Sequence, residues 1–87
     1  MTESTKHSTR VGTLVRAWRA KRKLSQLALG LRAGVSTRHL SFVESGRALP
    51  SADMILRLCD SLEVPLRERN QLLLAAGFAP RYPEARR

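Results

Sequence analysis

A short stretch in the middle of the chain combines side chains that can contact bases and phosphates. Residues 37–47 carry two arginines, a phenylalanine and several hydroxyl groups, with one acidic residue among them. An arginine can donate two parallel hydrogen bonds to guanine O6 and N7, and an aromatic edge can pack against a thymine methyl group. In a helix in which Leu40 faces the core, an advance of about 100° per residue turns Arg38, Ser41 and Phe42 outward. These residues therefore predict a surface that contacts nucleic-acid bases.

The charge distribution supports the same interpretation. The chain has 87 residues and a formal net charge of +9, with thirteen arginines and three lysines. Residues 1–50 contain ten basic and two acidic residues, whereas residues 51–87 contain six and five. Positive charge confined to one half is typical of a domain that faces a polyanion, and arginine favours planar, bidentate contacts. The alternative is a solvated face whose charge serves only solubility.

The spacing of apolar residues predicts an all-α fold of five helices in one domain. Ser25 and Ser36 can cap two short helices, 26–33 and 37–44, and Gly34 between them can adopt the positive φ of a tight turn. Two capped short helices joined by one glycine form a helix-turn-helix. The other helices are expected over 11–23, from the Ser51 cap to a break at 63–65, and over 66–76.

Both ends of the chain lack this apolar spacing. Residues 1–8 are polar, so we expect a flexible N-terminal arm. Residues 78–87 contain two prolines and a basic end, which is typical of a tail or linker. The folded domain is therefore expected over 9–77.

Two further residues are expected to hold the helices together. Arg19 follows the apolar stripe of the first helix, and Glu44 is the one acidic residue between residues 4 and 52. A charge on a core stripe is costly unless it is paired, so we expect an ion pair between Arg19 and Glu44 that fixes the third helix on the first. Gly30 is expected where the second and third helices cross closely.

A set of residues in segment 25–47 matches a known pattern. The matching residues are Gln26, Leu29, Gly30, Gly34, Val35, Ser36, Leu40, Val43 and the ending Glu44-Ser45-Gly46-Arg47. With them, the segment resembles the helix-turn-helix of the phage-repressor-like XRE family of DNA-binding regulators. The pattern extends over residues 11–76. This resemblance implies a lambda-repressor-like five-helix bundle that binds double-stranded DNA, with helix 37–44 in the major groove and the same Arg19–Glu44 bridge.

The resemblance also implies roles for single residues. Gln26 would touch the DNA backbone, and Thr37, Arg38, His39 and Phe42 would face base edges or flanking phosphates. Phe42 departs from the polar residue that is usual at its position. Arg47 follows a glycine where the loop would pass the sugar-phosphate chain. Together with the outward face, the predicted contact residues are Gln26, Ser36, Thr37, Arg38, His39, Ser41, Phe42 and Arg47.

Segments 38–44, 65–70 and 73–80 are similar to the MmyB-like subgroup of actinobacterial-type regulators. This likeness implies a bacterial transcriptional regulator that continues past residue 83 into a larger ligand-sensing domain. The chain would then be the DNA-binding fragment of a longer protein. Because one such domain reads few base pairs, we also expect a homodimer on a two-fold operator. Leu74, Phe78 and Tyr82 are candidates for the dimer contact, or alternatively for packing against the further domain.

Several other functions are disfavoured. No apolar run is long enough to span a membrane, and a single cysteine indicates a reducing, cytoplasmic compartment. The sequence contains no glycine-rich phosphate loop and no histidine–cysteine cluster, so we expect no enzyme, cofactor or metal. A protein-interaction module, such as an antitoxin or adaptor of the same fold, is the main alternative. Non-specific RNA binding is weaker, because no exposed run of stacking aromatics is present.

Overall fold

The computed structural model describes the backbone of residues 3–83 and the side chains of residues 6–83. Within this range it contains five α-helices and no strand, which confirms the all-α prediction. The helices are α1 (Glu3–Lys21), α2 (Gln26–Ala33), α3 (Thr37–Glu44), α4 (Ala52–Leu62) and α5 (Leu66–Ala75).

Three of these helices begin at the serines that the sequence marks as caps. The hydroxyl oxygens of Ser25, Ser36 and Ser51 accept hydrogen bonds from backbone N–H groups three residues further on, at 3.0, 3.0 and 3.1 Å. Each bond satisfies a donor that a helix start would otherwise leave unpaired. Gly34 ends α2 in the left-handed region at φ 70°, as the tight turn requires. Local chemistry therefore sets the bounds of the helix-turn-helix.

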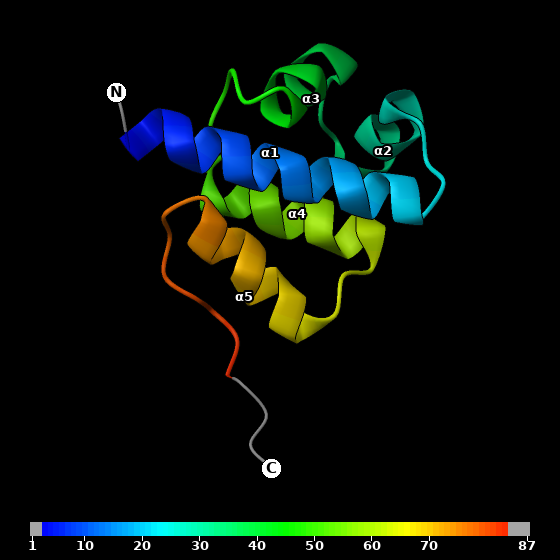
Figure 1. Ribbon diagram of the computed structural model, residues 1–87. Helices are drawn as coiled ribbons and strands as arrows, with labels where there is room; N and C mark the ends of the chain where they lie inside the picture. The colour runs from blue at the N-terminus through cyan, green and yellow to red at the C-terminus, as the bar shows by residue number, and fades with distance from the viewer. Residues whose placement is uncertain (1–2, 84–87) are drawn as a thin grey trace.

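The helices pack in two groups around α1. Figure 1 shows α1 running across the molecule, with α2 and α3 along one side, α5 on the opposite side and α4 behind it. The core between them is made of aliphatic side chains from all five helices. Its largest fully buried members are Leu29, Leu40, Ile55, Leu58, Leu62, Leu72 and Leu73. α3 thus lies on one side of the bundle, away from α5.

Two glycines permit the closest backbone approaches. A Cβ atom on Gly12 of α1 would overlap the carbonyl oxygens of Val43 and Glu44, so α1 crosses the end of α3 at this glycine. A Cβ atom on Gly30 would overlap the carbonyl oxygen of Val35. The prediction that Gly30 is small because α3 crosses it closely is therefore wrong. Gly30 approaches the turn between α2 and α3, and the helix that crosses α3 closely is α1, at Gly12.

The N-terminal boundary differs from the prediction. Residues 3–8, expected in a flexible arm, belong to α1, whereas Met1 and Thr2 lie outside the described residues. Ser8 is 6% exposed, and the His7 ring lies against Gly77 beyond α5. The polar residues 3–8 lack the apolar spacing that predicts a helix. Gly77, just after α5, has no side chain and so leaves room for the His7 ring. At its other end α1 stops at Lys21 rather than Lys23, which has a φ of +58°.

The C-terminal boundary also differs. Residues 78–82, expected in a tail, fold back along α5, and residues 84–87 lie outside the described range. Phe78 packs against the core. Asn70, which is 1% exposed, accepts hydrogen bonds from the N–H groups of Arg81 and Tyr82 at 3.1 and 3.0 Å and donates to the Tyr82 carbonyl at 2.7 Å. A buried amide on α5 thus satisfies both its donor and its acceptor through the returning chain.

Candidate nucleic-acid interface

α3 presents one face to the core and the other to solvent. Leu40 and Val43 have no exposed surface, and both seat the helix on the bundle. Thr37 and Arg38, at the N-terminal end, are exposed. The other predicted contact residues of the helix, His39, Ser41 and Phe42, are partly buried. The outward side chains of α3 are therefore most exposed in the first turn and less exposed toward the C-terminal end.

The start of α3 is suited to an anion. The oxygen of the Ser36 hydroxyl accepts from the His39 N–H at 3.0 Å, which leaves its proton able to donate to a ligand. The first amides of a helix have no partner within it, and the helix dipole favours negative charge there. Exposed Arg38 adds a full positive charge in the same turn. A phosphate would find several donors at this end.

The partly buried Phe42 ring has two arginines beside it. The guanidinium carbons of Arg38 and Arg47 lie 5.7 and 5.8 Å from the ring centroid. Arg38 reaches the ring from one turn earlier on α3, whereas Arg47 comes from the loop after α3. The loop is held by backbone hydrogen bonds, since the N–H groups of Arg47 and Ala48 donate to the Phe42 carbonyl at 2.8 and 3.2 Å. The structure therefore brings these three predicted contact residues together.

A buried ion pair joins α1 to the C-terminal end of α3. Arg19 Nε and Nη2 donate to the two carboxylate oxygens of Glu44 at 2.7 and 2.9 Å, and Nη1 donates to the Leu24 carbonyl at 2.9 Å. The Glu44 side chain is only 4% exposed. The hydrogen bond to Glu44 raises the pKa of Arg19, although burial opposes the shift. The ion pair expected from the sequence is thus present, with bidentate geometry.

Gln26 takes part in this cluster. Its side-chain nitrogen donates to Glu44 Oε1 at 3.0 Å, so part of the amide expected to face DNA is engaged inside the protein. A polar cleft of about 220 Å³ opens beside it. The cleft is lined by Arg16, Arg19, Gln26, Ser41, Glu44 and Ser45. Gln26 can therefore both support Glu44 and offer its remaining amide atoms to a ligand.

Arg16 is a further candidate, which the predicted contact residues do not include. It is exposed and lines the cleft together with Ser41 of α3 and Ser45, the residue that follows the helix. The sequence carried one usable signal, because Arg16 lies one helical turn before Arg19 and so shares its face of α1. Charge alone could not distinguish it from the other basic residues of the first helix.

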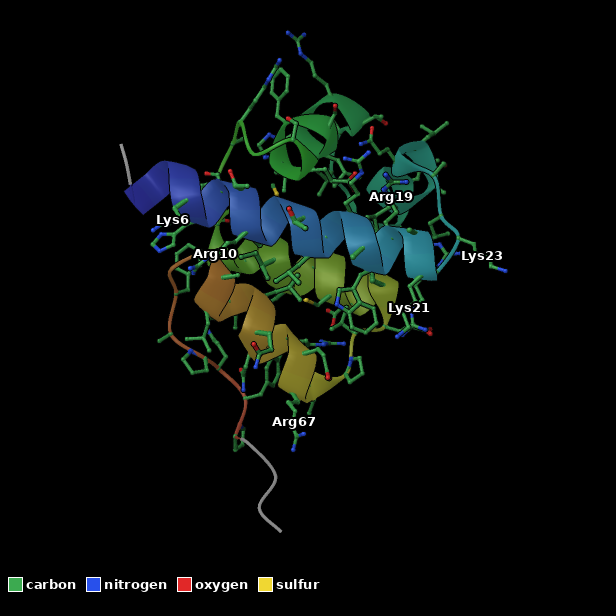
Figure 2. All side chains as sticks on the ribbon, in the orientation of Figure 1. Lys6, Arg10, Arg19, Lys21, Lys23 and Arg67 are labelled. Carbon is green, nitrogen blue, oxygen red and sulfur yellow. The ribbon has the colours of Figure 1, made fainter. Side chains whose placement is uncertain are left out.

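The remaining basic residues are spread around the molecule. Figure 2 shows Lys6 and Arg10 near the start of α1, Lys21 and Lys23 near its end, and Arg67 on α5, far from α3. Arg22 is engaged with the end of α4, since it donates to the carbonyls of Leu62 and Glu63 at 2.7 and 2.9 Å. The excess charge of the first half therefore does not define the interface by itself. Lys21 and Arg22 also lie on one aromatic ring, Trp18, at 4.8 and 5.3 Å from its centroid. The α3 surface differs from that cluster because Arg38 and Arg47 meet on Phe42 beside the capped start of the helix.

A comparison with protein-family models matches residues 15–69 to the family described as helix-turn-helix. This match covers α2, α3 and α4 and most of the chain. The chain belongs to the helix-turn-helix family. It is a DNA-binding domain of the XRE type, with the expected five-helix fold. No curated protein matches the chain significantly.

The described part of the chain has neither a cluster of metal-ligating side chains nor a helix that could span a membrane. No group of three or more histidine, cysteine or acidic side chains there could hold a metal ion. No described helix is both long enough and apolar enough to cross a membrane. The helix-turn-helix family is a DNA-binding family, which gives indirect support to the prediction that the chain is not an enzyme.

Proposed function

We propose that this domain binds DNA sequence-specifically, in the cytoplasm, as part of a bacterial transcriptional regulator, with α3 in the major groove. The observation that carries this proposal is the exposure of Arg38 on a helix whose opposite face is anchored by Leu40 and Val43. The major groove is about 12 Å wide and admits an α-helix. A seated helix with an exposed arginine can therefore present a bidentate donor to base edges.

The contact residues divide into two groups. Arg38 reads a base, most simply a guanine, with Thr37, His39, Ser41 and Phe42 beside it. Ser36, Gln26 and Arg47 bind phosphates and set the register, and Arg16 joins them through the cleft that it shares with α3. The Arg19–Glu44 pair holds α3 at a fixed angle to α1, so that these contacts form together.

The finer family assignment is also a proposal. We infer that the domain belongs to the MmyB-like subgroup and that a ligand-sensing domain follows it in a longer protein. The buried amide of Asn70 and the core side chain of Phe78 fall in the two C-terminal segments of that likeness. Both residues have a clear packing role, which supports reading those segments as a structural signature.

A homodimer on a two-fold site is the expected binding form. Of the three candidates for the dimer contact, Phe78 packs on the core and the Tyr82 ring lies 5.8 Å from the Arg69 guanidinium. Leu74 remains 51% exposed. An apolar cleft of about 330 Å³ lies between α1 and α5 and is lined in part by Leu14 and by Ala75, which follows Leu74 in the chain. Leu74 is thus the candidate best placed for a dimer contact.

Selection of bound duplexes from a random DNA pool tests the proposal. A two-fold motif should emerge whose half-sites are one or more helical turns apart. On the selected duplex, Arg38→Ala should lose about 1–3 kcal/mol of binding free energy and relax the base preference at one position. Arg67→Ala is the matched control, because it removes the same charge from an exposed position on α5, far from α3 (Figure 2). An equal loss from Arg38→Ala on every sequence would show that Arg38 contacts only phosphate.

A protein-docking module is the second candidate. Leu27 and Leu31 lie one turn apart on α2 and are 60% and 76% exposed, which favours a protein partner there. Salt separates the two functions. Binding to DNA through several phosphates weakens steeply as salt rises, whereas docking of apolar side chains does not.

A further inference from the structure

We propose that Phe42 is a positioning residue that couples Arg38 and Arg47 into one recognition unit. The inference rests on the proposed DNA-binding function and goes beyond it. In this unit the ring does not read a base. It orients a base-reading guanidinium and a phosphate-binding guanidinium, whose central carbons lie 5.7 and 5.8 Å from its centroid.

Among the described residues, the Phe42 ring, and not an acidic side chain, holds the two arginines. The described ion pairs of the chain include neither Arg38 nor Arg47, and the nearby carboxylate of Glu44 is taken up by Arg19 and Gln26. The ring instead attracts both guanidiniums through its negative face, at 5.7 and 5.8 Å. An aromatic ring orients a cation without neutralising it. Both charges therefore remain available to an anion or to a guanine edge.

The backbone of Phe42 also holds the loop that carries Arg47. The Phe42 carbonyl accepts hydrogen bonds from the N–H groups of Arg47 and Ala48 and from the Ser45 hydroxyl, which donates at 3.2 Å. Gly46, at φ 82°, allows the chain to turn back in this way. The same residue thus fixes the backbone of Arg47 through its carbonyl and the guanidinium of Arg47 through its ring. Arg47 moves with α3 although it lies outside the helix.

Two neighbouring guanidiniums suit a ligand that carries several negative charges. Because the Arg38 and Arg47 guanidiniums lie on the same ring, the two positive charges are kept near each other. A polyanion that contacts both of them stabilises this arrangement. Duplex DNA offers a phosphate beside the base edges that α3 can reach. Ordering two long side chains before binding lowers the entropic cost of the complex. Base and phosphate contacts made from one ring should therefore strengthen each other.

A double-mutant cycle on the selected duplex tests the coupling. Fluorescence anisotropy would measure the affinities of the wild type, Arg38→Ala, Arg47→Ala and the double variant. The double variant should bind at least threefold more tightly than the product of the two single losses predicts. In a Phe42→Leu background the two losses should become multiplicative. Multiplicative losses with Phe42 intact would overturn the proposal, and this arm involves two exposed residues, so it does not depend on a core substitution.

The ring itself is tested by two substitutions. Phe42→Leu should weaken specific binding about five- to tenfold, because two cation–π contacts are lost. Phe42→Tyr, which keeps the aromatic face, should restore affinity to within about twofold. Urea unfolding of each variant checks that the fold is retained. Equal affinity of Phe42→Leu and the wild type, or failure of Phe42→Tyr to restore binding in a folded chain, would overturn the proposal.

A direct contact between the ring and a thymine methyl group predicts a different result. Operators in which deoxyuridine replaces thymidine lack that methyl group. Under the present proposal, this replacement affects the wild type and Phe42→Leu equally. A loss in the wild type that disappears in Phe42→Leu would show that the ring reads a methyl group and would overturn the proposal. A wild type that selects and binds no duplex would instead overturn the proposed function itself.

Discussion

Two arginines tie neighbouring elements of this fold together, one on the α3 side and one on the α5 side. Arg19 donates to both carboxylate oxygens of Glu44 and to a loop carbonyl. Arg69 donates to one carboxylate oxygen of Asp60 at 2.6 Å and to the Val64 carbonyl at 2.7 Å. The two pairs differ in solvent access, because the exposed fraction of the acidic side chain is 4% for Glu44 and 72% for Asp60.

This difference separates the roles of the two regions. An ion pair that water reaches contributes little net free energy, whereas a buried charge that loses its partner is costly. We therefore expect the Arg19–Glu44 pair to contribute to stability and to hold α3 on α1. On the α5 side the neutral hydrogen bonds of Asn70 do more to hold the returning chain than the Arg69–Asp60 pair does.

The largest expected effect follows from removing the buried acid. Glu44→Ala should lower the free energy of unfolding by about 3 kcal/mol, because three donors, Arg19 Nε and Nη2 and Gln26 Nε2, lose a carboxylate that is only 4% exposed, whereas Asp60 accepts one such bond. Urea unfolding monitored by circular dichroism measures the change. If Glu44→Ala lowers the free energy of unfolding no more than Asp60→Ala does, the two ion pairs do not differ in the way proposed.

Removing the buried amide should come next. Asn70→Ala should cost about 2 kcal/mol, since the backbone groups of residues 81 and 82 lose three hydrogen bonds to its side chain. The neighbouring exposed residue supplies the control, Gln71→Ala, for which little change is expected. DNA affinity should be nearly unchanged in both variants, because α5 lies across the bundle from α3 (Figure 1). A large loss of affinity would show that the two regions are coupled.

Alkaline pH should destabilise the fold through Cys59, which is buried on α4. Burial raises the pKa of the Cys59 thiol from 9.0 to about 11, while Arg69 nearby lowers it and Asp60 raises it. The folded chain thus holds this proton more tightly than the unfolded chain, and the resulting stability is lost as the pH rises from about 9 to about 11. The expected fall is about 1–2 kcal/mol. Unfolding between pH 8 and 10.5 should show a shallower pH dependence in Cys59→Ala than in the wild type. Equal slopes would assign the alkaline loss to other groups.

The smallest effect is expected at the exposed acid. Asp60→Ala should lower the free energy of unfolding by less than about 1 kcal/mol, because water already surrounds most of its carboxylate. The same urea experiment measures it, and salt offers a second test. Added salt should reduce the difference between Asp60→Ala and the wild type but should change the effect of Glu44→Ala much less.

Much of the local structure follows from the amino-acid sequence by itself. Serines at positions 25, 36 and 51 and the glycine at position 34 set where α2, α3 and α4 begin and where α2 ends, because caps and turns depend on neighbouring backbone groups. The apolar period correctly placed Leu40 inward and Arg38 outward. Even the Arg19–Glu44 pair could be expected, since a charge on a core stripe needs a partner.

Tertiary structure alone decided the remaining features. Gly12 meets the carbonyls of α3, His7 lies on Gly77, Asn70 holds residues 81 and 82, and the loop after α3 brings Arg47 to the Phe42 ring. Each of these contacts joins elements whose relative positions depend on how the whole core packs. Local spacing reports which side of a helix is apolar, but it carries no information on which distant backbone or ring that side will meet.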